Sequence, residues 1–180
     1  MYEAVTSRRS VCRFTDRHVP REVLERVLSA AAWASPAPHL QPRRVYVLTG
    51  RPLVELEKLL GERGAAVGAS AALFCYVDRD LGPARWSDLG MCLQTVMLLL
   101  RAEGLHGCTQ MAWAKHHRGV AEVLSPPEGL ILFCGMSMDV ARRDRAPAGV
   151  VRPTGKPAAR LNGVLARKIR RIMSQIGLPS

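Results

Sequence analysis

The sequence has few aromatic residues and no long apolar segment, and these absences exclude several classes of protein. Phe, Tyr and Trp together make up 5% of the 180 residues, too few for a surface on which nucleic-acid bases stack. The net charge of +11 is large, but the basic residues are spread along the chain rather than gathered in one stripe. We therefore expect no nucleic-acid partner. The apolar runs are also too short to span a bilayer.

The short motifs of many enzymes are missing as well. The sequence has no glycine-rich phosphate loop of the Rossmann or Walker type, no nucleophile elbow and no catalytic carboxylate pair. Adjacent His116 and His117 do not share a helix face, and no two cysteines have the close spacing of a zinc site. We expect no bound metal.

The five cysteines are unpatterned, and no charged segment followed by an apolar run opens the chain. These features predict reduced thiols and a cytoplasmic location. Four of the cysteines lie in apolar runs and are expected to be small buried side chains: Cys75, Cys92, Cys108 and Cys134.

Hydrophobic periodicity predicts one α+β domain over residues 1–150. Helices are expected over 20–34, 52–62 and 119–124, and strands over 44–48, 71–77 and 130–136. The segment 151–180 is expected to hold an extended linker and then a basic amphipathic helix over 159–176. That helix could pack on a partner subunit or coat a membrane surface, and we favour the partner.

The stretch 86–114, WSDLGMCLQTVMLLLRAEGLHGCTQMAWA, is the centre of the chain. Ser87 is placed to cap a helix, and the residues from Leu89 to Leu100 are apolar on nearly every side. Such a helix is buried in a core. Gly104 is placed to end it in a left-handed conformation, and a strand or loop is expected over 105–113.

Four pieces of this stretch resemble the nitroreductase family of FMN-dependent oxidoreductases: WSDLGM at 86–91, GL at 104–105, CTQ at 108–110 and AWA at 112–114. The resemblance implies a mixed sheet flanked by helices on both faces. It also implies a homodimer with two FMN molecules at the interface. NAD(P)H would reduce the flavin, and a nitroaromatic, a quinone or a similar acceptor would reoxidise it. A flavin carries the electrons itself, so the missing catalytic motifs fit this family, and the resemblance implies that no side chain needs to act as a catalytic acid or base.

The resemblance extends to the beginning of the chain, where Arg8, Arg9 and Ser10 open the pattern RRS-x-x-x-F. Paired guanidinium groups beside a hydroxyl suit a phosphate, although a solvated basic turn would look the same. In the family, the first arginine and the serine hold the FMN phosphate. The Arg-x-x-Arg-Ala-Pro pattern adds Arg142 and Arg145, and Arg145 matches the family's basic residue that closes on this phosphate.

A proline-rich segment at 35–42 resembles the family's loop that reaches the flavin of the opposite subunit. It implies cofactor contacts from Pro36, Ala37, His39 and Gln41. The loop is one residue shorter than usual, His39 replaces an asparagine, and Arg43 replaces a tryptophan.

The resemblance also places the backbone N–H groups of Thr109, Gln110 and Met111 beside the flavin ring. Two segments near the flavin are short, one between the first two strands and one after residue 136. These departures leave two alternatives open. One is a biosynthetic flavin dehydrogenase or oxidase resembling cyclodipeptide oxidase, which assembles with a small partner protein. The other is a flavin-free member that acts as a binding subunit.

Overall fold

The protein is described from a computed structural model. The structure describes residues 2–11, 14–15, 17–34, 43–60 and 69–140. All of them belong to one compact unit, Met1–Arg142. The predicted C-terminal helix over 159–176 lies outside the described residues, so it stays a prediction.

The centre of this unit is a four-stranded sheet in the order β1-β2-β4-β3. The strands are β1 (Arg43–Thr49), β2 (Ala71–Asp78), β3 (His106–Gln110) and β4 (Leu130–Asp139). All three ladders between neighbouring strands are antiparallel. The sequence predicted a mixed sheet, with both parallel and antiparallel pairing. In the described part of the chain, parallel pairing is limited to one isolated bridge between Ser10 and Gly107.

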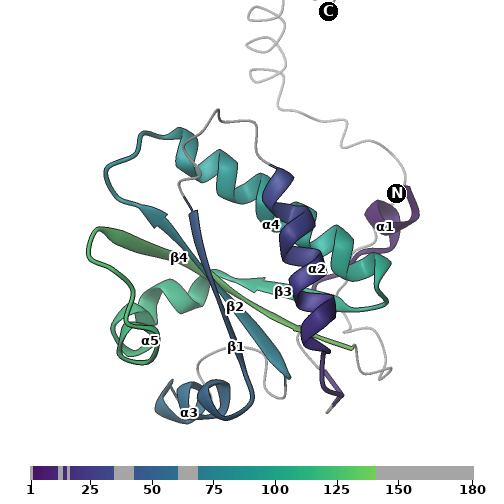
Figure 1. Cartoon of the computed structure of the whole chain (residues 1–180), viewed down its shortest axis with the longest axis horizontal. Helices are drawn as coiled ribbons and strands as arrows, with labels where there is room; N and C mark the ends of the chain where they lie inside the picture. Colours follow the sequence, from purple (N-terminus) through teal and green to yellow (C-terminus); the bar gives the residue numbers. More distant parts are fainter. Residues whose placement is uncertain (1, 12–13, 16, 35–42, 61–68, 141–180) are drawn as a thin grey trace, which may run out of the picture. The chain divides into compact units, whose positions relative to one another are not determined.

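Helices cover both faces of the sheet, as the sequence predicted (Figure 1). On one face lie α2 (Arg21–Ala31) and α4 (Ala84–Ala102), and on the other lie α3 (Arg51–Leu60), α5 (His117–Leu124) and the 3-10 helix η3 (Met111–His116). A short helix, α1 (Tyr2–Ser7), contacts α4. The α+β class is therefore confirmed.

Strand β2 shows how the two faces share the core. Leu73 and Cys75 belong to the apolar cluster beneath α2 and α4, whereas Phe74 and Tyr76 belong to the cluster beneath α3 and α5. This alternation follows from the two-residue period of a strand. Because both faces are covered, β2 is apolar at every position before Asp78, and the sequence predicts such a strand correctly.

Helix α4 differs from its predicted form at its N-terminus. It begins at Ala84 rather than after Ser87, and the Ser87 hydroxyl donates a hydrogen bond to the carbonyl of Ala84 inside the first turn (2.9 Å). Pro83 precedes the helix with φ −56°, a value that proline fixes and that suits a helix start. The predicted end is confirmed, because Gly104 has φ +77°.

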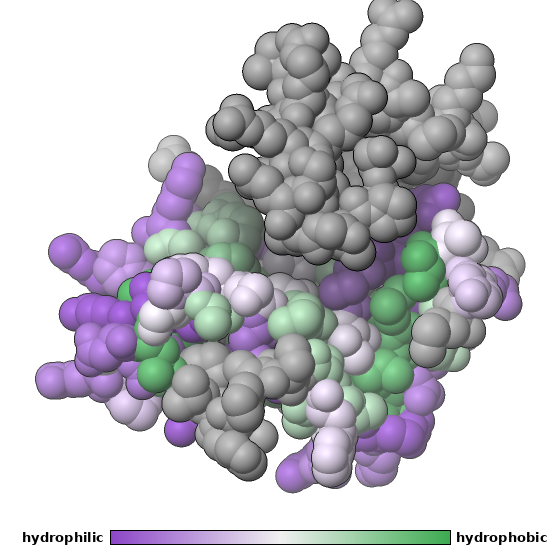
Figure 2. All heavy atoms as spheres, turned by 90° about the horizontal axis from the view of Figure 1, so that it is seen from above, coloured by the Kyte–Doolittle hydropathy of each residue, from purple (hydrophilic) through white to green (hydrophobic). Residues whose placement is uncertain are grey.

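Burial of α4 is also one-sided. Leu89, Val96 and Leu100 are buried, but Trp86 and Met91 are 37% and 41% exposed. The expectation of a helix buried on every side is therefore wrong for the described chain. Figure 2 shows apolar residues lying between hydrophilic side chains on the described surface seen from above.

The four cysteines expected in the core are buried, at 5% exposure or less. A hydrogen bond to Cys134, together with burial, holds the pKa of the Cys75 thiol well above its usual range. In the part of the chain that the structure describes, no group of His, Cys, Asp and Glu is arranged to hold a metal ion. No described helix is both long and apolar enough to cross a membrane.

Candidate functional site

The N-terminal segment brings the predicted phosphate-binding residues to the outer edge of β3. Helix α1 ends at Ser7, and Ser10 then forms its parallel bridge with Gly107. Further along, Phe14 packs with Cys108 in a small apolar cluster. These contacts hold the segment beside β3, although the two are far apart in the sequence.

Arg8 and Ser10 face each other on this segment. A guanidinium nitrogen of Arg8 lies 3.4 Å from the hydroxyl oxygen of Ser10. Arg9 turns the other way and donates to the backbone carbonyls of Thr6 (2.9 Å) and Arg8 (2.7 Å). Neither arginine is in an ion pair within the described ranges. The structure thus brings together Arg8 and Ser10, and it gives Arg9 a role in holding the turn.

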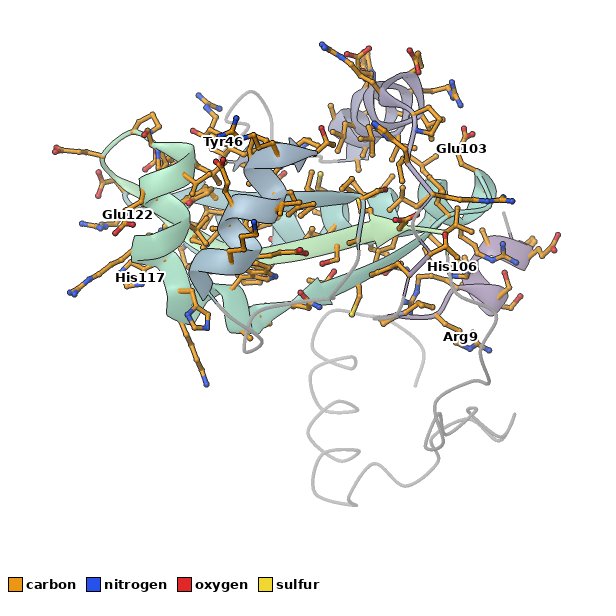
Figure 3. The ribbon with its side chains drawn as sticks, turned by 90° about the horizontal axis from the view of Figure 1, so that it is seen from below. Arg9, Tyr46, Glu103, His106, His117 and Glu122 are labelled. Atoms are coloured by element: carbon orange, nitrogen blue, oxygen red, sulfur yellow. The ribbon has the colours of Figure 1, made fainter. Side chains whose placement is uncertain are left out.

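Two further residues support this segment and were not predicted from the sequence. Arg101, in the last turn of α4, donates from Nε to the Ser7 hydroxyl (2.9 Å). His106 begins β3 and lies near Arg9 (Figure 3). Burial and the charge of Arg101 lower the pKa of His106, against a smaller opposing effect of a backbone hydrogen bond at Arg9. These effects favour the neutral form of the ring beside the two arginines. No local sequence pattern predicts the contact of Arg101 with Ser7 or that of His106 with Arg9.

The C-terminal end of β3 carries the residues predicted to face the flavin ring. The Thr109 hydroxyl lies 3.7 Å from the sulfur of Met97 on α4, so this side chain points to the α4 face. Gln110 accepts a hydrogen bond at Oε1 from the indole N–H of Trp113 (2.7 Å). Met111 is 52% exposed. Arg8–Ser10 and Thr109–Met111 therefore lie along the same edge strand.

The other predicted contacts lie outside the described residues: Pro36, Ala37, His39, Gln41, Arg142 and Arg145. They stay predictions. The structure does describe the chain on both sides of segment 35–42, which η1 (Ala32–Ala34) precedes and β1 follows.

An ion pair joins these two flanks to the central helix. Arg43, the first residue of β1, donates from Nη1 to Asp88 on α4 (2.5 Å) and from Nη2 to the carbonyl of Ala32 (2.9 Å). The side chains of Arg43 and Asp88 are 7% and 2% exposed. The sequence marks Arg43 only as a departure from a family pattern, whereas the structure shows it bound to Asp88 on α4 and to Ala32 on the other side of the segment.

The described residues fit a flavin phosphate cofactor. Arg8 and Ser10 offer donors and uncompensated positive charge for a phosphate, as anion recognition requires. At the other end of the strand, the amide nitrogen of Gln110 donates to no described acceptor. The site thus holds a charged end and an uncharged end with spare donors.

Comparison with known proteins finds similar sequences. The model of the nitroreductase family matches residues 5–84, which include Arg8 and Ser10 and end before the stretch 86–114. A 4-nitrobenzoate reductase of Pseudomonas putida is 25% identical, over 76% of this chain and 83% of its own length. A nitrobenzene nitroreductase of Ectopseudomonas oleovorans is also 25% identical, over 76% of this chain and 84% of its own.

Solved structures give the same result. The FMN- and NADPH-dependent nitroreductase NfnB from Sphigopyxis sp. strain HMH superimposes with a TM-score of 0.66 at 29% identity, covering 78% of this chain and 87% of that one. A single-residue variant of that enzyme gives a TM-score of 0.73 over 81% and 92%. In its fold and in the sequences of these relatives, the chain is similar to the nitroreductase family.

Proposed function

We propose that the protein is an FMN-dependent oxidoreductase that passes hydride from NAD(P)H through bound FMN to a nitroaromatic, a quinone or a similar acceptor. One observation carries the proposal. Within a nitroreductase fold, a single edge strand holds the Arg8–Ser10 pair at one end and Gln110 at the other. FMN has the matching chemistry, with an anionic phosphate at one end and a ring rich in hydrogen-bond acceptors at the other.

Arg8 and Ser10 anchor the phosphate end of the cofactor. A guanidinium group gives a phosphate two parallel, charge-assisted hydrogen bonds, and a hydroxyl adds a third. The bridge between Ser10 and Gly107 fixes the position of Arg8 and Ser10 along β3.

The far end of β3 orients the ring. The flavin supplies the two-electron chemistry when it is bound, so the protein has to place it and tune its electronics. Gln110 contributes donors, and the exposed side chain of Met111 contributes a soft apolar surface that adapts to different planar molecules.

The acceptor class rests on the relatives. They are named for 4-nitrobenzoate, nitrobenzene and chloronitrobenzene, so we propose an aromatic nitro compound as the acceptor. These names favour this function over a biosynthetic oxidase with a small partner protein.

A homodimer completes the proposal. Trp33 on η1 is 89% exposed, and Trp86 and Met91 on the neighbouring α4 are also exposed. Large apolar side chains left exposed on adjacent elements favour an interaction surface there. A second subunit would cover them, and the predicted helix over 159–176 would pack on that subunit.

The test is a two-step reaction followed by absorbance. The purified protein should bind FMN in a one-to-one ratio per chain, and anaerobic NADH or NADPH should bleach the flavin absorbance. Addition of 4-nitrobenzoate should restore it, and steady-state plots at several acceptor concentrations should be parallel, as expected for a ping-pong reaction. A protein that binds no FMN after reconstitution would instead be a flavin-free binding subunit.

A further inference from the structure

Gln110, at the C-terminal end of β3, forms a unit with two residues that the proposed function has not used, Trp113 and Gly135. Gln110 and Gly135 are direct partners in the ladder between β3 and β4. Trp113, in the 3-10 helix that follows β3, is 2% exposed and donates its indole N–H to Oε1 of Gln110 (2.7 Å). Its ring also packs edge-on against Phe74, with centroids 5.0 Å apart.

Gly135 makes this arrangement of the indole possible. A Cβ atom at this position would lie 2.5 Å from Cδ1 of Trp113 and 2.8 Å from Nε1. No real carbon atoms approach so closely, so any side chain here would push the indole away. The indole therefore packs directly against the backbone of Gly135 on β4, the residue that pairs with Gln110.

The indole determines which way the Gln110 amide faces. A glutamine amide has an oxygen that accepts and a nitrogen that donates, and its two orientations have nearly the same shape. An indole N–H is only a donor, so the oxygen has to face Trp113. The nitrogen, with two N–H donors, then faces away from the indole. Among the described residues, none accepts a hydrogen bond from it.

We propose that Trp113 is a positioning residue for the cofactor. It holds the Gln110 amide in one orientation, so that the amide nitrogen donates to an acceptor atom on the ring of bound FMN. Gly135 serves the same purpose by leaving room for the indole. This inference rests on the proposed FMN function, and it adds two residues that act on the flavin only through Gln110.

The first test is a double-mutant cycle on FMN affinity, measured by flavin fluorescence on the full chain. Trp113→Phe keeps a buried ring but removes the N–H donor, and Gln110→Ala removes the amide. Each should weaken FMN binding about three- to tenfold, the size of one net hydrogen bond. Because both act on the same bond, Trp113→Phe should have no further effect in a Gln110→Ala background.

The second test reverses the polarity of the amide. Gln110→Glu has the same shape and still accepts the indole N–H with one oxygen. Its other oxygen would present an anionic acceptor to the flavin ring, where the amide presents donors. This variant should weaken FMN binding more than Gln110→Ala does, and it should shift the flavin absorption spectrum.

Phe74→Leu is the control for lost packing, because it loosens the ring of Trp113 without removing its N–H. It should lower the melting temperature and leave the FMN dissociation constant within about twofold. The proposal is overturned if Trp113→Phe binds FMN like the natural protein, if its effect persists fully in Gln110→Ala, or if Gln110→Glu binds FMN unchanged. Failure of the unmodified protein to bind FMN would refute the proposed function instead.

Discussion

The ion pair between Arg43 and Asp88 gives the sharpest test of how the start of β1 is held to α4. Arg43→Met removes the charge and keeps most of the volume. It leaves the Asp88 carboxylate buried without its cation, and one oxygen of that carboxylate, Oδ1, already has no hydrogen-bond partner. The carbonyl of Ala32 loses a donor as well.

The expected cost follows from the burial of both side chains, 7% and 2% exposed. Removing one member of a buried pair typically costs about 3–5 kcal/mol, because an uncompensated charge stays in the core. That is a large part of the roughly 5–15 kcal/mol that stabilises an ordinary domain. Replacing both members by apolar residues removes the charge altogether, so Arg43→Met with Asp88→Leu should recover most of the loss.

Urea unfolding followed by circular dichroism measures these differences. FMN binding and dimer formation both shift apparent stability, so all variants need the same protein and FMN concentrations. Arg51→Met is the matched control, because its ion pair with Glu55 is exposed (90% and 55%). It should cost less than about 1 kcal/mol. A cost below about 1 kcal/mol for Arg43→Met, or a double variant no better than the single one, would refute the reasoning.

Three further predictions test other parts of the molecule. Arg8→Ala should weaken FMN binding about ten- to a hundredfold, since a charge-assisted hydrogen bond contributes roughly 1.5–3 kcal/mol; retention of full flavin after dialysis would contradict this. Burial raises the pKa of Tyr76 from 10.0 to about 12. The folded protein favours the neutral phenol of Tyr76. Its contribution to the free energy of unfolding should therefore be complete below pH 10 and disappear as the pH rises through 12. Tyr76→Phe should abolish this part of the alkaline loss in pH-dependent unfolding. Truncation after Gly155 should weaken the dimer and its hold on FMN without any lipid, as measured by sedimentation. A truncated dimer that keeps its flavin, with a full-length chain that sediments with anionic vesicles, would favour the membrane alternative.

The sequence predicted the strands better than the ends of the helices. Strand β2 is buried on both faces, so its apolar run is distinctive, and the predicted range 71–77 differs from the observed strand by one residue at its end. The start of α4 was predicted one turn too late. Ser87 competes for a capping position with Pro83, and both residue types are common at helix starts.

The site was predictable only in part, because its contacts are long-range. The motif identifies Arg8 and Ser10, but only the folded sheet shows that Ser10 pairs with Gly107. The ion pair of Arg43 with Asp88 joins the beginning of a strand to a helix 45 residues later, and no local pattern encodes such a distance. The bond between Trp113 and Gln110 spans three residues, but it depends on the bare backbone of Gly135 on another strand.

The position of β2 in the middle of the sheet also has a consequence for folding. Its neighbour β1 comes earlier in the chain, but its other neighbour, β4, begins only at Leu130. Until that segment has been synthesised and has docked, AALFCYV presents an unpaired edge of an apolar, uncharged strand. Such segments pair readily with other chains, and pairing between distant segments is slow. We therefore expect fragments that end before β4 to aggregate rather than fold, and expression at low temperature to increase the yield of the complete chain.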